Sequence, residues 1–138
     1  GGSFIWLLSP VEACPAMTAT RCKSIALLRR RADLSRADFI DYYERQHAPL
    51  ILSLLPGIVD YRRNFANFES AFVSDGAAPF DFDVVTELWF ADRGAYDRAM
   101  AVATAEDVAA RIAADEENFL DRSATRMFLV EERTSPLG

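Results

Sequence analysis

His47 is the only histidine in this chain of 138 residues, and it lies in the stretch YERQHAPL, two residues before Pro49. A neutral imidazole titrates near physiological pH, so His47 is a candidate general base or general acid. Pro49 has no backbone N–H and therefore leaves the carbonyl group of Arg45 without its helical partner. His47 could instead be a core residue that hydrogen-bonds such a carbonyl, and the sequence leaves both interpretations open.

Asp115 is a second polar residue at an apolar position of a predicted helix. At the helical period its side chain falls on one stripe with Val108, Ile112 and Phe119. A carboxylate next to an imidazole favours the protonated ring and fixes its tautomer, so we predict that Asp115 is catalytic as the orienting partner of His47. The alternative is that Asp115 caps a last short turn, because Asp is a favoured N-cap residue.

Three aromatic residues carry a polar atom at the tip of a large apolar side chain. They are Tyr43, one turn before His47, and Tyr61 and Trp89 on predicted strands. Such side chains suit the wall of a small-molecule pocket, and we predict that they bind substrate, although ordinary core packing explains them as well. The sequence has no HExxH, CxxC, GxGxxG, P-loop or GxSxG pattern, so it gives no support for a metal site, a nucleotide site or a serine hydrolase.

The helix that must position His47 is predicted over residues 35–54. Ser35 can cap its first turn, and a Pro-Gly pair at residues 56 and 57 ends it. Pro49 falls on the solvent side and predicts a kink just after His47. The stripe that faces the core consists of Phe39, Ile40, Tyr43, His47, Leu50, Ile51 and Leu54.

Apolar runs of strand length occur at residues 22–29, 58–65, 83–90 and 124–132. A second helical region begins near Asp92, and Thr104 is predicted to cap its continuation. The order is β-α-β-β-α-β, which predicts an α+β fold, a ferredoxin-like sandwich with both helical regions on one face of a four-stranded antiparallel sheet. Three strands are apolar on both faces, so we predict that the sheet of a second subunit packs on the open face, giving a homodimeric α+β barrel.

The composition is that of a folded domain, with 51% hydrophobic and 26% charged residues. We divide the chain into a leader at residues 1–21, one domain at residues 22–133 and a tail at residues 134–138. The net charge of −6 argues against a nucleic-acid partner, and no apolar run approaches the ~20 residues that span a membrane. Two cysteines are too few for a disulfide scaffold and favour a cytoplasmic location.

Four sequence blocks, in this order, resemble the EthD family of dimeric α+β barrel proteins. The blocks are RADLSRADFIDYYERQHAPLI, LPGIVDYRRNF, FDVVTELWF and DEENFLD, and a strand that ends in VEE follows the last one. The resemblance covers Lys23 to about Glu132. It implies a homodimer with a pocket between each sheet and its own helices. It also matches His47 to the histidine of the HAPL block and Asp115 to the first acidic residue of the DE block.

The resemblance implies an enzyme without metal or organic cofactor that uses a histidine or a carboxylate to move protons on a small carbonyl, aromatic or lactone-like compound. A lyase, isomerase or cyclase step suits this chemistry. Two alternatives stay open: a haem- or quinone-handling monooxygenase of the same barrel group, and a metabolite-binding or accessory protein without turnover. Fold alone does not separate these three functions.

Overall fold

The structure, a computed structural model, describes residues 21–138, so the predicted leader lies outside the described residues except for Arg21. The strands are β1 (Cys22–Leu28), β2 (Ile58–Phe65), β3 (Val84–Phe90) and β4 (Arg126–Val130). The α-helices are α2 (Arg36–Tyr42), α3 (Ala48–Leu54), α4 (Arg93–Ala103) and α5 (Glu106–Glu116). A π-helical turn, η2 (Tyr43–His47), joins α2 to α3, and two short 3-10 turns are η3 (Phe68–Ser70) and η4 (Arg122–Ala124).

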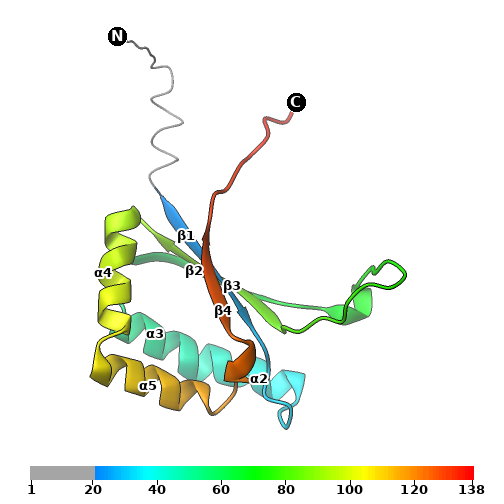
Figure 1. Cartoon of the computed structure of the whole chain (residues 1–138), viewed down its shortest axis with the longest axis horizontal. Helices are drawn as coiled ribbons and strands as arrows, with labels where there is room; N and C mark the ends of the chain where they lie inside the picture. Colours follow the sequence, from blue (N-terminus) through cyan, green and yellow to red (C-terminus); the bar gives the residue numbers. More distant parts are fainter. Residues whose placement is uncertain (1–20) are drawn as a thin grey trace.

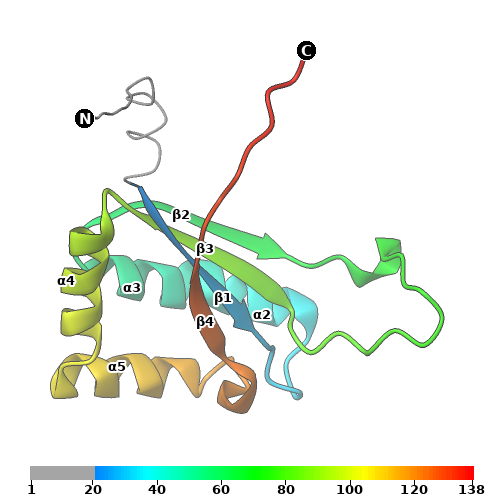
Figure 2. The same ribbon diagram turned by 45° about the horizontal axis from the view of Figure 1, so that its top comes forward.

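The four strands form one antiparallel sheet in the order β2-β3-β1-β4. The two central strands are β1 and β3, and Ala26 at the middle of β1 pairs with Thr86 on β3 and with Met127 on β4. All four α-helices lie on the same side of this sheet (Figure 1; Figure 2). The predicted ferredoxin-like α+β fold is therefore confirmed.

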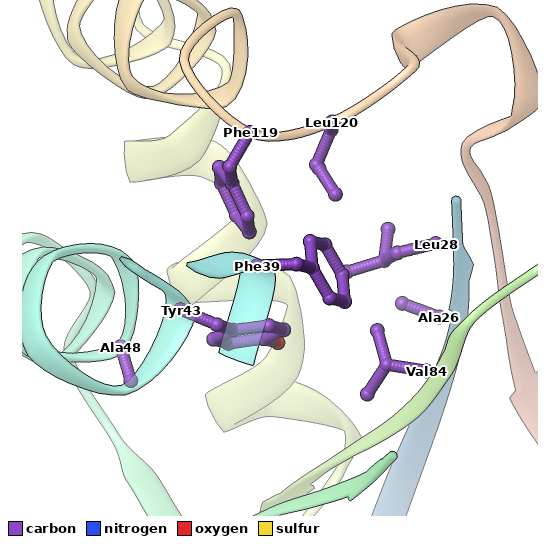
Figure 3. Close-up of a cluster of buried hydrophobic side chains, with 8 residues drawn as sticks. All are labelled: Ala26, Leu28, Phe39, Tyr43, Ala48, Val84, Phe119 and Leu120. Carbon is purple, nitrogen blue, oxygen red and sulfur yellow. The ribbon is translucent and has the colours of Figure 1, made fainter. Parts of the chain in front are cut away.

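The core lies between the sheet and the helices, because alternate residues of the central strands point to the helical side. On β3 these residues are Val84, Thr86, Leu88 and Phe90, and all four are buried. From the helical layer, Phe39 points at the sheet and stacks on Phe119, with 5.7 Å between the ring centroids (Figure 3). Sequence periodicity thus correctly predicts the buried face of the first helix, where Phe39, Tyr43 and Ile51 are all buried.

Helix α2 begins as predicted, since the Ser35 side chain accepts a hydrogen bond from the backbone N–H of Asp38. The predicted kink at Pro49 takes the form of the π-helical turn just before it. The N–H of Ala48 reaches back five residues to the carbonyl of Tyr43, one residue further than in an α-helix. The helical path continues through α3, so the proline changes the pitch of the helix without ending it.

Thr104 was predicted to cap a continuing helix, and this prediction is wrong. Thr104 closes α4, where its hydroxyl donates a hydrogen bond to the carbonyl of Met100 over 2.8 Å. Ala105 then precedes α5 and makes no side-chain cap. A threonine hydroxyl bonds the preceding turn as readily as it caps a following one, and the sequence does not distinguish the two.

The connection between β2 and β3, residues 66–83, extends away from the sheet as an arm (Figure 1; Figure 2). Within it the rings of Phe68 and Phe80 stack on each other, with 4.5 Å between their centroids. It is a long hairpin connection, as the sequence indicates.

Between residues 21 and 138, no helix has the length and apolar character needed to cross a membrane.

The opposite face of the sheet carries no helix in the described part of the chain. Cross-strand partners share a face, and on this side Ile25 of β1 pairs with Phe128 of β4. The side chain of Lys23 on the same face is paired with Glu87 and Glu132. The remaining apolar residues of this face are Leu27, Val85, Trp89 and Val130. This composition resembles that of a sheet that packs on another layer.

We propose that the sheet of a second copy of the chain covers this face. Phe128, which is 46% exposed in the single chain, tests the proposal because Phe128→Asp would bury a charge in the interface. Sedimentation should show a dimer for the wild type and a monomer for the variant.

Leu52→Asp is the matched control, because Leu52 is 52% exposed but lies on α3, away from the sheet. We expect that variant to stay dimeric. A wild-type chain that sediments as a monomer at micromolar concentration contradicts the barrel dimer.

Candidate active site

The structure brings His47 and Asp115 together between two helices. His47 is the last residue of η2, and Asp115 lies in the last turn of α5. The His47 Nδ1 atom is 2.7 Å from Asp115 Oδ2, and only 6% and 12% of the two side chains are exposed. Asp115 therefore does not cap a final turn, and the His47 ring is bonded to a carboxylate and not to the backbone carbonyl that Pro49 leaves free.

Two further residues hold the Asp115 carboxylate from its other side. The Tyr42 hydroxyl donates to Asp115 Oδ1 over 2.6 Å, and the Asn118 side-chain amide donates to the Tyr42 oxygen over 2.9 Å. Burial, together with the neighbouring carboxylate, raises the pKa of the Tyr42 hydroxyl, so it keeps its proton and acts as a donor. Both oxygens of Asp115 thus have a partner, as a largely buried carboxylate requires.

The imidazole of His47 is packed between two aromatic rings. Phe119 lies 4.8 Å from it and Tyr43 lies 5.1 Å from it, measured between ring centroids. Phe119 follows α5 directly, so the same helix end supplies the carboxylate and one wall of the ring site. The orientation of His47 is therefore set by packing as well as by its hydrogen bond.

A cavity of about 330 Å³ adjoins His47 between the helices and the sheet. Its volume is at the lower end of the range of ~300–1,000 Å³ that is usual for small-molecule sites. His47 lines it and Asp115 does not, and Asp115 already occupies Nδ1, so Nε2 is the ring nitrogen that is left to interact with a ligand. Most of its wall is apolar and comes from Ala26, Leu28, Ile51, Leu55, Leu88, Met100, Ala103, Ala109, Ile112, Ala113 and Met127.

A row of hydroxyl groups forms one polar part of the cavity wall. The Tyr43 and Thr86 oxygens lie 2.6 Å apart, and the Tyr61 hydroxyl donates to the Tyr43 oxygen over 3.1 Å. Burial raises the pKa of both tyrosines above the usual range, so these groups stay neutral. The Tyr61 proton goes to Tyr43, and the Tyr43 proton can go to Thr86, so the Thr86 hydroxyl at the end of the row keeps a proton for a bound oxygen atom. The two tyrosines cannot supply a phenolate base.

Trp89 does not join this cavity, and its assignment to the same pocket is wrong. Successive residues of β3 point to opposite faces, so the buried neighbours Leu88 and Phe90 take the helical side and Trp89 takes the other. There the Lys23 ammonium group lies 4.5 Å from the centre of its ring. The residue type alone does not predict on which face of the sheet an aromatic side chain lies, because this depends on the strand register.

One ion pair lies at the wall formed by α5 and the segment before β4. Arg122 Nε is 3.0 Å from Glu116 Oε1, and both residues line the cavity. Each charge is thus neutralised by the other, so this wall offers no unpaired cation to an anionic ligand.

The described residues contain no cluster of three or more histidine, cysteine or carboxylate side chains that could hold a metal ion. The chemistry that the visible residues can perform is proton transfer. His47 can exchange a proton at Nε2, and Asp115 lies on the far side of the ring to stabilise the charged imidazole.

Sequence reasoning missed Tyr42, Asn118 and Thr86. Asn118 stands in the DEENF block three residues after Asp115, so helical spacing could have indicated that the two lie on one side of the chain. Tyr42 precedes Tyr43 and falls off the apolar stripe, and Thr86 has an alternating strand position that is usual for core residues. Only the packing of α5 against η2 reveals what these three side chains do.

The family model of the EthD domain matches residues 31–123. A search of the curated proteins finds no match. Among solved structures, an ethyl tert-butyl ether d (EthD) family protein from Bacillus halodurans is similar with a TM-score of 0.53 and 21% identity, over 82% of this chain and 99% of that one.

Two other solved structures share the fold at lower identity. SnoaB, a cofactor-independent oxygenase from Streptomyces nogalater, has a TM-score of 0.51 and 15% identity, over 85% of this chain and 97% of its own. HapK from Hahella chejuensis has a TM-score of 0.51 and 17% identity, over 84% and 97%. At these identities the likeness concerns the fold and not the reaction.

The hydroxyl row predicts a stability difference between two threonines of the cavity wall. Thr86→Val should lower the free energy of unfolding by about 1–2 kcal/mol, because it leaves the buried Tyr43 hydroxyl without that partner. Thr104→Val is the control, and its exposed hydroxyl should change stability by no more than about 0.5 kcal/mol. Urea denaturation measures both, and equal losses for the two variants would contradict the pairing of Tyr43 with Thr86.

Proposed function

We propose that this chain, which belongs to the EthD family, is an enzyme that transfers protons on a small, uncharged carbonyl, aromatic or lactone-like compound without a metal or organic cofactor. The observation that carries the proposal is the hydrogen bond between His47 Nδ1 and Asp115, at the wall of an apolar cavity. A lyase, isomerase or cyclase step fits this arrangement, because each of them requires a positioned base or acid.

The apolar walls support an uncharged substrate. An anion in the cavity would lose its hydration and find the guanidinium of Arg122 already paired with Glu116. A carbonyl oxygen, in contrast, needs only a hydrogen-bond donor, and the neutral hydroxyl row of Tyr61, Tyr43 and Thr86 leaves one such donor, the Thr86 hydroxyl at its end. In this assignment Tyr43 and Tyr61 bind substrate, and Trp89 does not.

A second candidate is oxygenation, and the fold that this chain shares with SnoaB, a cofactor-independent oxygenase, favours it. The same base would start that reaction, because removal of a proton gives an electron-rich carbon that can react with dioxygen. Consumption of dioxygen during turnover separates the two candidates. A protein that binds such a compound and does not convert it is the remaining possibility, and an assay of turnover addresses it.

His47→Gln tests the proposed role of the imidazole. Glutamine can still donate a hydrogen bond to Asp115, so the variant should melt within a few degrees of the wild type. Its rate of proton transfer should fall about 10²–10⁴-fold, the usual contribution of a positioned acid or base. The measurement is deuterium exchange next to the carbonyl group of cyclic diketones, aryl ketones and lactones in heavy water, followed by NMR.

Gln46→Ala is the matched control, because Gln46 belongs to the same π-helical turn but is exposed. It should exchange deuterium at the wild-type rate. Full activity of His47→Gln would contradict a catalytic role of His47. Ready unfolding of the variant would indicate that His47 has a structural role.

A further inference from the structure

A series of hydrogen bonds links Asn118, Tyr42 and Asp115 to Nδ1 of His47. The direction of donation along this series decides which nitrogen of the ring carries the proton. We infer that Asn118 and Tyr42 are positioning residues that make His47 start the reaction as a base, so that the substrate is a carbon acid whose acidic C–H bond lies next to a carbonyl group. The inference rests on the proposed function and names the substrate class and the order of the proton transfers.

The direction follows from the number of protons on each group. A side-chain amide nitrogen can only donate, so Asn118 Nδ2 gives a hydrogen to the Tyr42 oxygen. The single hydroxyl proton of Tyr42 is then directed to Asp115 Oδ1, 2.6 Å away. A hydrogen bond that is donated to a carboxylate stabilises its ionised form. An ionised Asp115 can only accept, so the proton between it and His47 belongs to His47 Nδ1.

The neutral ring therefore carries its proton on Nδ1 and leaves the lone pair on Nε2. Nε2 makes no hydrogen bond to any other residue in the described range 21–138, while the ring lines the cavity. A lone pair takes up a proton and cannot give one, so His47 begins as a base. Reactions that start with protonation of the substrate require a proton on Nε2, as in the opposite tautomer or in the imidazolium.

The chemical step balances without any further reactant. The C–H bond next to the carbonyl breaks, its electron pair stays on the substrate as an enolate, and the proton goes to Nε2. The resulting imidazolium is paired with the Asp115 carboxylate. The enolate oxygen can accept a hydrogen bond from the Thr86 hydroxyl of the cavity wall, whose proton is free when Tyr61 donates to Tyr43 and Tyr43 donates to Thr86. Return of the proton to another atom of the substrate restores the neutral ring.

Packing keeps the chain of hydrogen bonds in place. The Tyr42 ring stacks on Phe119 at 5.0 Å between centroids and an interplanar angle of 29°, and Phe119 in turn contacts the His47 ring. Tyr42 is thus attached to the site twice, by its hydroxyl to Asp115 and by its ring to Phe119. This double attachment distinguishes it from an ordinary surface tyrosine.

The test uses the full chain labelled with ¹⁵N in its single histidine, so that the two ring nitrogens give the only imidazole signals. At alkaline pH and without substrate, the wild type should show a protonated Nδ1 and an unprotonated Nε2. Tyr42→Phe removes the donor to Asp115, and Asn118→Asp replaces the amide donor by a group that accepts the Tyr42 proton itself. Both variants should increase the fraction of the other tautomer and slow deuterium exchange about 10–100-fold.

Tyr96→Phe is the matched control, because it removes a tyrosine hydroxyl on α4 that makes no hydrogen bond within residues 21–138. It should leave the tautomer and the exchange rate unchanged. Asn118 is exposed, so its variant keeps the test valid even if Tyr42→Phe is unstable.

A wild-type ring with its proton on Nε2, or an Asn118→Asp protein whose tautomer equals that of Tyr96→Phe, would overturn the inference. This readout needs no substrate, so its failure is distinct from failure of the proposed function, which the turnover of His47→Gln decides.

Discussion

The structure around the candidate site depends on the burial of one carboxylate, that of Asp115. Only 12% of its side chain is exposed, so its oxygen atoms need hydrogen-bond donors from the protein. Asp115 meets this need with one proton from His47 and one from Tyr42. Both donors come from the first helical region, whereas Asp115 comes from the second. These two bonds therefore fix how α5 lies against η2, and with it the cavity wall that α5 contributes.

The widened turn η2 explains how one helix serves two sets of hydrogen bonds. Tyr42 and Tyr43 are adjacent in sequence, yet the hydroxyl of Tyr42 bonds α5 and that of Tyr43 bonds Thr86 of the sheet. His47 lies one turn further on and contacts the ring of Tyr43. Pro49 stands at the start of α3, directly after this π-helical turn. The wider turn precedes the proline, and the helix continues without a break into α3.

The sequence predicts the parts of this protein that depend on periodicity and local caps. Strand and helix order and the buried face of the first helix follow from the spacing of apolar residues. The same spacing places His47 and Asp115 at core-facing positions of their helices, but it leaves open whether the two side chains are in contact. The face of a single aromatic residue on a strand does not follow from this spacing, as Trp89 shows, because it depends on the strand register. The prediction that Thr104 caps the following helix is wrong for another reason, because a threonine hydroxyl can form a hydrogen bond with the turn before it or with the turn after it. Tyr42 and Asn118 could not be assigned from sequence, because their partners come from distant parts of the chain.

The negative charge next to the imidazole lies on one side only, at Nδ1. This arrangement favours transfer of a proton from a neutral substrate to Nε2. The carboxylate of Asp115 faces Nδ1, whereas the cavity that His47 lines has mostly apolar walls, neutral hydroxyls and one ion pair, Arg122 with Glu116. A proton that arrives at Nε2 creates a positive ring whose counter-charge is already in place. The negative charge left on the substrate can accept a hydrogen bond from the Thr86 hydroxyl at the end of the hydroxyl row. The protein therefore stabilises both charges that the transfer creates, the positive imidazolium and the negative substrate, and the net charge of the site does not change.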